Sequence, residues 1–400
     1  MKQSIIFWLD APPVCCKGLF DAVAEQWNGE ACYVIAGEIS EDRAVLVDST
    51  CDCVESENRR IKYVFFHEMK DATARYTFLE SYKDDIHVFN GYMSRSAVYL
   101  KKLLKINKNA KVIVWAERPC VDLQYRGKMK KLFRFLHTCR HSLYALRYRR
   151  RVTALCALGD KGVEAYQKLG WPAEKVFPLL YLPDVKMVSY DTPVNKTKDS
   201  MVRFVYLGRF SAGWKGTDLL IDACKHLKNQ NYSLEMVGGY GDYKEKTMQY
   251  ISQNDHLSFG GTWKIHEACE RLHNFDVCIV PSRFEGWNVT VNEALMAGIG
   301  CIVTDEAVSD ELVRESGAGL IIKPDAQSIA NAMDMVMDDP ECINSFKRNA
   351  CAYRDRISAN VCAQYFIDVT NFLFDEDGGK VKPVAPWMEE KNNGKCGKNT

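Results

Sequence analysis

Short apolar runs alternate with longer helical patterns along most of this 400-residue chain, and this alternation limits the possible folds more than any other feature. The runs before residue 186 are 4–9, 31–36, 86–89, 111–115 and 154–158, and those after residue 200 are 203–207, 233–237, 277–280, 301–303 and 319–322. Runs of this length are typical of strands buried in a parallel sheet, with helices as crossover connections. Because the polar stretch 186–200 interrupts the alternation, the sequence predicts two doubly wound α/β domains.

Composition narrows the class of protein and its surroundings. With 47% hydrophobic and 26% charged residues the chain is of ordinary globular composition, and 400 residues suffice for two domains. A formal net charge of +1 provides no overall field for nucleic acid, so no nucleic-acid partner is expected. The start of the chain lacks a signal-peptide pattern, and no apolar run approaches the ~20 residues that span a bilayer, so we expect a cytosolic chain.

The cysteine and acidic residues do not indicate a metal site. The 16 cysteines are scattered, and neither Cys15-Cys16 nor Cys51-Asp52-Cys53 has the spacing of a four-ligand zinc site. Buried free thiols are the expected state. The acidic run 375–377 begins a very polar tail, where a solvated run is expected. We therefore predict no metal.

The stretch 281–298 contains two carboxylates eight positions apart, Glu285 and Glu293. An apolar run before it predicts a buried strand, and Asn288 predicts the N-cap of a helix that ends at Gly298. The backbone N–H groups of such a helix start face the C-terminal edge of the sheet, where open α/β folds bind ligands. Glu293 is then placed to accept hydrogen bonds from two neighbouring ribose hydroxyls, and Glu285 to face a sugar. A helix whose acidic first turn only complements its dipole is the alternative.

A second motif, at 206–220, predicts a cradle for a polyanion. A strand ends in a glycine turn that carries Arg209, and Lys215 and Gly216 then open a helix. Arg and Lys at such a loop can offset the roughly two negative charges of a nucleotide diphosphate through bonds worth about 1.5 to 3 kcal/mol each. No metal is then required to stabilise a departing diphosphate. Ordinary surface charge is the alternative.

The order of the motifs carries more information than each motif alone. Gly-Arg-x5-Lys-Gly at 208–216 is followed by Val-Gly-Gly at 237–239, by Phe-Gly-Gly-Thr at 259–262 and by Pro-Ser-x2-Glu-Gly-x6-Glu-Ala-x2-Ala-Gly at 281–298. This order resembles the retaining glycosyltransferases of family 4, which have the GT-B fold, closely over about 202–323 and more loosely elsewhere. The resemblance implies transfer of a hexose from a nucleotide diphosphate sugar to a hydroxyl of a glycan or lipid-linked glycan, with retained anomeric configuration, in cell-surface polysaccharide assembly and without a cofactor.

The resemblance also implies a domain organisation in which two Rossmann-like domains face a central cleft. We expect an acceptor-side domain at 1–185, a domain that binds the nucleotide sugar at 186–355, and a helix at 356–375 that crosses back onto the first domain. The composition of 376–400, rich in Gly, Lys, Pro and Asn, predicts a disordered tail in which Trp387 could dock.

Site residues follow from the resemblance by position. Arg209 and Lys215 are expected to bind the donor diphosphate, and Glu293 the ribose. Glu285 is expected to hold the transferred sugar. Expected catalytic residues are Glu285, Arg209, Lys215 and Glu117, and expected donor-binding residues are Gly208, Arg209, Lys215, Gly261, Thr262, Glu285, Gly286, Trp287, Asn288, Val289 and Glu293.

The N-terminal half departs from the family pattern. Many members have a glycine-rich loop after the first strand, whereas 10–18 keeps only its final glycine. Many also carry a histidine near the reacting centre after the fourth or fifth strand, and this chain has Glu117 and Arg118 at the comparable strand end. We therefore predict that Glu117 takes this place, and that His67 and His87 are core or edge histidines.

A basic stretch at 126–151 predicts a local positive patch. It contains ten Arg and Lys residues among apolar and aromatic ones, and no acidic residue occurs from Leu123 to Gly159. Such a patch could lie on an anionic membrane surface and meet a lipid-linked acceptor. A solvated basic helix and a nucleic-acid surface use the same residues, so these alternatives remain open.

Two other classes of function fit the same fold. One is a two-domain protein that closes on a ligand without chemistry. The other is a sugar-nucleotide epimerase or hydrolase. Paired acidic and basic motifs at one cleft favour turnover over simple binding.

Overall fold

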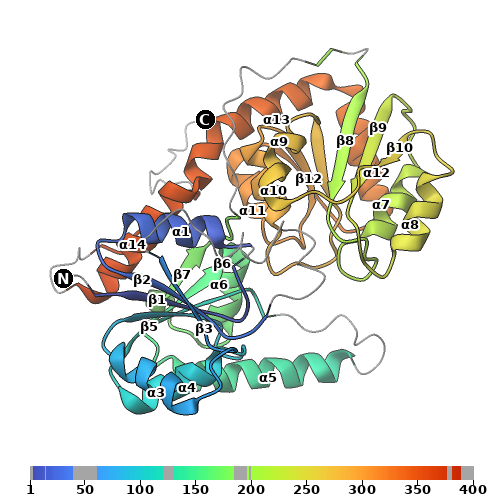
Figure 1. Cartoon of the computed structure of the whole chain (residues 1–400). Helices are drawn as coiled ribbons and strands as arrows, with labels where there is room; N and C mark the ends of the chain where they lie inside the picture. Colours follow the sequence, from blue (N-terminus) through green and yellow to red (C-terminus); the bar gives the residue numbers. More distant parts are fainter. Residues whose placement is uncertain are drawn as a thin grey trace, which may run out of the picture.

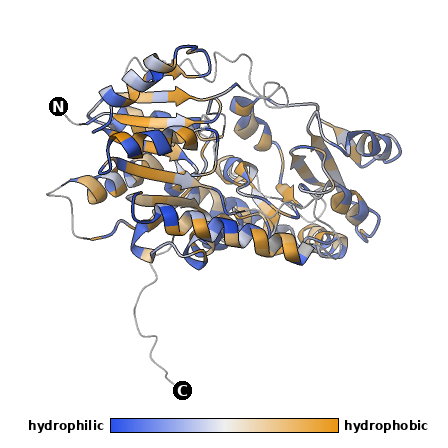
Figure 2. Ribbon diagram, turned by 90° about the horizontal axis from the view of Figure 1, so that it is seen from below, coloured by the Kyte–Doolittle hydropathy of each residue, from blue (hydrophilic) through white to orange (hydrophobic). Residues whose placement is uncertain are grey.

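The computed structural model describes residues 3–13, 15–38, 61–119, 130–183, 196–197, 200–375 and 381–388. These residues form two parallel β-sheets with helices packed on them (Figure 1). Figure 2 shows mainly hydrophobic strands inside the molecule and mixed hydrophilic and hydrophobic residues on the surrounding helices.

The first sheet has the order β3-β2-β1-β4-β5-β6-β7 and is parallel throughout. Its strands are β1 (Ile5–Leu9), β2 (Ala31–Ile35), β3 (Ile61–Phe65), β4 (Ile86–Asn90), β5 (Lys111–Ala116), β6 (Ala154–Leu158) and β7 (Val176–Leu179). The helices between them are α1 (Lys17–Gln26), α3 (Ala72–Ser81), α4 (Ala97–Ile106), α5 (Lys130–Tyr148) and α6 (Gly159–Lys168).

The second sheet has the order β10-β9-β8-β11-β12-β13 and is also parallel. Its strands are β8 (Val202–Leu207), β9 (Tyr232–Val237), β10 (Leu257–Phe259), β11 (Val277–Val280), β12 (Gly300–Thr304) and β13 (Gly319–Ile322). Its helices are α7 (Thr217–Cys224), α8 (Lys244–Ile251), α9 (Ala268–Leu272), α10 (Val289–Met296), α11 (Asp310–Ser316), α12 (Ala326–Asp338) and α13 (Pro340–Tyr353), and α14 (Ala359–Phe374) follows.

The predicted fold class, two doubly wound α/β sheets, is confirmed. Each of the ten apolar runs coincides with a strand to within one residue at either end. The structure adds three strands that the apolar runs do not reveal, β3, β7 and β10, and all three lie at sheet edges. An edge strand is buried less completely, so its pattern is weaker: β3 alternates with an exposed lysine, β7 contains Pro178, and β10 has three residues.

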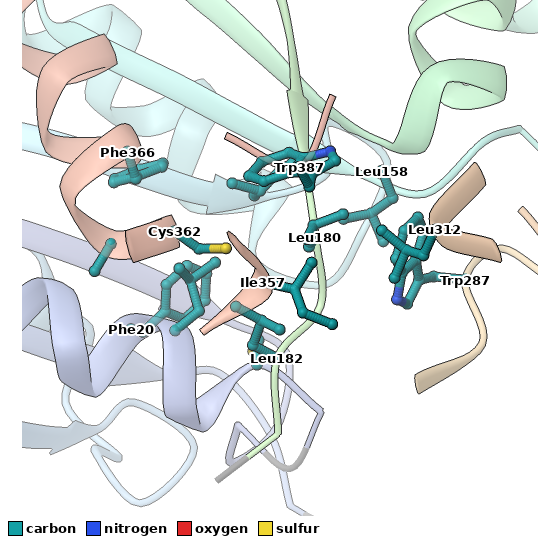
Figure 3. Packing of buried hydrophobic residues seen from close by; sticks show 14 of the residues in the cluster. Phe20, Leu158, Leu180, Leu182, Trp287, Leu312, Ile357, Cys362, Phe366 and Trp387 are labelled. Atoms are coloured by element: carbon teal, nitrogen blue, oxygen red, sulfur yellow. The ribbon is translucent and has the colours of Figure 1, made fainter. Parts of the chain in front are cut away.

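The two halves of the chain share one hydrophobic cluster (Figure 3). Helix α14 packs against α1, and the rings of Phe7 and Phe366 lie 6.4 Å apart. Further along the cluster, Leu158 of the first sheet lies beside Trp287 and Leu312 of the second half. The C-terminal edges of both sheets therefore face each other.

The expected disorder of the tail at 376–400 is wrong for residues 381–388. Trp387 is fully buried, and its carbonyl oxygen accepts a hydrogen bond of 2.5 Å from the hydroxyl of Tyr353. Arg356 donates to two further carbonyls of this segment. Composition alone predicts disorder for this polar segment. Burial of the indole offsets the conformational entropy that is lost when the segment becomes ordered. The other tail residues lie outside the described residues.

The cysteines of the described segments are free thiols, and most are buried, as predicted. Cys51 and Cys53 lie outside these segments. Within them, no helix has both the length and the apolar character needed to cross a bilayer.

A buried charge cluster stabilises the base of the second sheet. Asp276 is fully buried, and its carboxylate contacts Lys347 at 2.9 Å, Lys196 at 2.8 Å and Arg203 at 3.3 Å. Burial alone would raise the pKa of Asp276, but the bonds from these cations outweigh it and hold the pKa at about 2.

Substitution Asp276→Asn should lower the free energy of unfolding by about 3 kcal/mol, because it leaves the buried Lys347 ammonium without its counter-charge. Chemical denaturation at pH 7 measures the change. Asp222→Asn is the matched control, since Asp222 forms an exposed pair with Lys225. Equal stability of the two variants would contradict the role assigned to Asp276.

Candidate active site

A cavity of about 490 Å³ lies between the C-terminal edges of the two sheets. Its second-half lining comes from the loops after β8, β9, β10 and β11 and from the start of α10. In the second sheet β8 and β11 are neighbours where the strand order reverses, which is where open parallel sheets bind ligands. The first half contributes Cys15, Glu117, Tyr181 and Pro183.

The structure brings nearly all of the sequence-predicted residues to this cavity. Its lining includes Gly208, Arg209, Lys215, Thr262, Glu285, Gly286, Trp287, Asn288, Val289, Glu293 and Glu117. Gly261 is the exception, since it is not among the lining residues. It has φ of 74° and its carbonyl accepts from Gly238 N–H at 2.8 Å, so it shapes the turn that presents Thr262.

Lys215 and Glu285 form the central ion pair of the site. Lys215 Nζ lies 2.6 Å from Glu285 Oε1, and both side chains are largely buried. The same carboxylate oxygen accepts from Ser282 Oγ at 2.8 Å and from Asn288 Nδ2 at 3.3 Å. The lysine ammonium has three donors, so it can keep Glu285 while it binds a ligand anion. Arg209 lies exposed on the same lining.

The loops after β8 and β11 approach each other closely at Gly216. This residue has φ of 65°, and a Cβ there would lie 2.0 Å from the carbonyl oxygen of Pro281. Arg283 reinforces the approach, because its guanidinium contacts both carboxylate oxygens of Asp218 and its backbone N–H donates to the carbonyl of Trp214 at 2.8 Å. The glycine therefore permits the packing that puts Lys215 on Glu285.

Asn288 caps helix α10 as predicted. Its backbone is extended, and its side chain accepts from the backbone N–H of Thr290 at 2.9 Å. Thr290 in turn donates from its hydroxyl to the carbonyl of Leu207, at the end of β8. The start of α10 is thereby fixed beside the cavity, where its backbone amides favour a negative ligand group.

Glu293 lies deeper, inside α10, and is 4% exposed. Burial raises the pKa of its carboxyl to about 8, against a smaller opposing effect of the Lys215 ammonium. Near neutral pH the carboxyl therefore carries a proton, so it can donate one hydrogen bond and accept another. A group that donates one hydrogen bond and accepts another can bind two neighbouring hydroxyls of a ligand.

Glu117 reaches the cavity from the end of β5. Tyr181 OH donates to Glu117 Oε1 at 2.9 Å, and the other carboxylate oxygen lies against Gly286 of the second half. A Cβ on Gly286 would lie 2.0 Å from that oxygen, so glycine is needed for this contact. Sequence reasoning missed Tyr181, because nothing in the local pattern marks it.

Neither predicted core or edge histidine lines the cavity. His87 is fully buried in β4, where its Nδ1 accepts from Trp8 Nε1 at 2.9 Å and its Nε2 lies 2.8 Å from the carbonyl of Tyr82. Burial lowers its pKa to about 4. His67 lies just after β3, and its ring is 3.8 Å from Glu68. Within the described segments no group of three or more His, Cys, Asp or Glu residues could hold a metal ion.

Comparison with known proteins gives matches over both halves. Residues 191–353 match the family model described as glycosyl transferases group 1. A curated relative in Bacillus subtilis, named putative glycosyltransferase EpsF, is 26% identical over 184 residues, which cover 43% of this chain and 46% of the relative. The chain thus spans about half the length of that relative.

Among solved structures, Anabaena HepE in complex with UDP and glucose has a TM-score of 0.67 at 14% identity, covering 92% of this chain and 98% of HepE. WaaG, described as a glycosyltransferase involved in lipopolysaccharide biosynthesis, has a TM-score of 0.58 at 14% identity and covers 93% of this chain and 100% of WaaG. These likenesses show the fold, two facing Rossmann-like domains of the GT-B type.

The raised pKa of Glu293 predicts a pH-dependent difference between wild type and Glu293→Gln without nucleotide. The unfolded state releases this proton near the ordinary glutamate pKa of 4.5, whereas in the folded state the pKa is about 8. Wild-type stability should therefore fall relative to the variant by up to about 1.4 kcal/mol per pH unit between these limits.

Chemical denaturation at pH 5, 6, 7 and 8 measures this difference. Glu311, whose pKa burial also raises, is present in both proteins, so its effect cancels. Parallel stability curves for the two proteins would contradict the assignment.

Proposed function

We propose that this chain is a glycosyltransferase. It moves a hexose from a nucleotide diphosphate sugar to a hydroxyl of a glycan or lipid-linked glycan acceptor, in cell-surface polysaccharide assembly. The observation that carries the proposal is the convergence in one cavity of two cations, Arg209 and Lys215, with the carboxyl groups of Glu285 and Glu293. Likeness to glycosyl transferases group 1 over 191–353 supports it.

In this proposal the second domain holds the donor. Arg209, Lys215 and the first amides of α10 take up negative charge as the diphosphate leaves, which stabilises the transition state more than the ground state. Glu293 holds the ribose diol, and the loop with Thr262 and Trp263 lies beside the nucleobase. The cations do this work without a metal. UDP is the first nucleotide to test, because HepE was solved with UDP.

The sugar lies between Glu285 and Glu117. Glu285 Oε1 is held by Lys215, Ser282 and Asn288, and in this proposal the carboxylate contacts the transferred sugar. Glu117 approaches from the acceptor-side domain, and it is placed to contact the sugar or the incoming hydroxyl. Retention of configuration is proposed on the resemblance of the motif order to family 4, and NMR of the product anomer tests it.

Lys215→Ala should lower turnover about 100-fold, because it removes one preorganised charge stabiliser from the diphosphate. Release of nucleotide diphosphate from a nucleotide sugar, with and without acceptor, measures it. Lys225→Ala is the matched control, since Lys225 lies exposed just after α7.

Unchanged turnover in Lys215→Ala would contradict the proposal that Lys215 binds the donor diphosphate. Release of nucleotide without any acceptor would identify a hydrolase instead. Nucleotide-sugar binding with no release would identify a binding protein.

We further propose that helix α5 rests on an anionic membrane surface at the cytoplasmic side, where a lipid-linked acceptor lies. The helix extends along the outside of the first domain (Figure 1). One of its faces is buried, at His141, Ala145 and Tyr148. The opposite face exposes a stripe of large hydrophobic residues: Leu132, Phe135, Leu136, Leu143 and Leu146.

Basic side chains flank this stripe. Lys131, Arg140 and Arg147 are exposed on α5, and Arg150 and Arg151 follow it. An apolar stripe with basic borders is the arrangement of a helix that lies in the plane of an anionic interface. The part of the basic stretch at 126–129 lies outside the described residues.

The double variant Phe135→Ser, Leu143→Ser should lose cosedimentation with vesicles of mixed anionic and zwitterionic lipid, because these side chains, 64% and 66% exposed, would enter the lipid. Met335→Ser, at a position 53% exposed on the second domain, is the matched control. Wild-type protein should bind at low salt and dissociate at high salt. No wild-type binding at low salt would end the proposal.

A further inference from the structure

We infer that Arg118 is a positioning residue, which fixes the loop carrying Glu285 only when the two domains are in contact. The inference rests on the proposed glycosyltransfer for its kinetic consequence. Its structural consequence is independent of that function.

The guanidinium of Arg118 makes several contacts across the domain boundary. Its Nε donates to the main-chain carbonyl of Glu285 at 3.0 Å. One terminal nitrogen donates to the main-chain carbonyl of Glu306 at 2.8 Å and to its carboxylate at 3.1 Å. The guanidinium carbon lies 4.0 Å from the centre of the Phe284 ring. A planar group with donors in several directions suits this combination of bonds and stacking.

These contacts converge on the segment that holds the catalytic carboxylate. The backbone N–H of Glu285 donates to the carbonyl of Glu306 at 3.2 Å, so Arg118 binds both the residue and the carbonyl that anchors it. The neighbouring Glu117 lies against Gly286. Two successive residues of the first domain thus contact three successive residues of the second, 284 to 286.

Within the described residues, the other ion pairs across the boundary lie elsewhere. Lys161 of α6 contacts both carboxylate oxygens of Asp310 at 2.7 and 2.8 Å, and Asp160 pairs with Arg314. These pairs join α6 to α11. Lys161 Nζ also donates to the main-chain carbonyl of Asp305 at 2.5 Å, but within the described residues none of these bonds is made to residues 284–286. They therefore provide a control for adhesion between domains without loop positioning.

The donor-binding groups all belong to the second domain. Arg209, Lys215 and Glu293 follow β8 or lie in α10, whereas the hydrogen bonds of Arg118 are to Glu285 and Glu306. Loss of Arg118 should therefore spare nucleotide binding and impair the chemical step, because Glu285 is no longer held in its productive orientation.

The experiment compares Arg118→Ala, Arg118→Lys and Lys161→Ala with wild type. For Arg118→Ala we expect a Kd for UDP within about threefold of wild type, and a kcat lower by about 100-fold, the scale of a small misplacement of a reacting group. Arg118→Lys should recover little of the loss, because an ammonium can neither bind both carbonyls in one plane nor stack as a guanidinium does. Lys161→Ala should keep kcat within about threefold.

Hydrogen–deuterium exchange supplies a readout that needs no turnover. The backbone amides of 284–287 should exchange faster in Arg118→Ala than in wild type, and Lys161→Ala should leave them unchanged. This comparison decides the inference even if no donor sugar is turned over by wild type, an outcome that would instead count against the proposed function.

Three results would overturn the inference. Unchanged exchange at 284–287 in Arg118→Ala would show that the loop does not need the arginine. An equal loss of kcat in Lys161→Ala would show that Arg118 only helps to hold the two domains together. Loss of UDP binding in a folded Arg118→Ala protein would place the residue in the donor site itself.

Discussion

The ion pair between Lys215 and Glu285 is the interaction on which the rest of the site depends. A lone charge in a largely buried cavity is costly, and here the carboxylate has its counter-ion at 2.6 Å and further donors in Ser282 and Asn288. The two partners come from loops after neighbouring strands, β8 and β11, so the pair exists only because these loops pack closely. That packing requires Gly216, where a side chain would strike a carbonyl oxygen. The ion pair therefore depends on the glycine at position 216, and both depend on the sheet order that makes β8 and β11 neighbours.

Two carboxylates share this cavity in different environments, and the difference suits different tasks. Glu285 sits among donors and a cation, so it is equipped to accept hydrogen bonds from a sugar. Glu293 is enclosed in α10, where burial raises its pKa to about 8 and leaves it protonated near neutral pH. A proton on Glu293 also avoids a second negative charge close to a bound diphosphate. Lys215 acts on both, because it pairs with Glu285 and opposes the effect of burial on Glu293.

The sequence was sufficient for features that are local, and insufficient for those that depend on how the two domains meet. Central strands were predictable because a strand buried on both faces is apolar throughout, and the cap at Asn288 because its side chain satisfies its own helix. Three of the four edge strands of the described sheets, β3, β7 and β10, were missed because their apolar patterns are weaker, whereas the fourth, β13, was predicted. The contact between Glu117 and Gly286, and the bond from Tyr181, join residues far apart in the chain and depend on the packing of one sheet edge against the other. The periodicity of the sequence carries no information about that packing. Glu117 could therefore be predicted to lie at a strand end, but its contact with Gly286 could not.

The first domain contacts the second mainly through main-chain atoms at this point, and this has a consequence for closure. Arg118 binds two carbonyl oxygens, and Glu117 lies on a glycine, so these contacts depend on the path of the loop. The Phe284 ring and the Glu306 carboxylate add two side-chain contacts to Arg118. Such contacts are made only when the loop has one conformation and the domains have met. Under the proposed function, a donor that contacts both domains would stabilise their closure and the loop conformation together, because each state includes the other. Closure would at the same time remove water from the cavity, which strengthens the pairing of Lys215 with anionic groups and protects an activated sugar from hydrolysis.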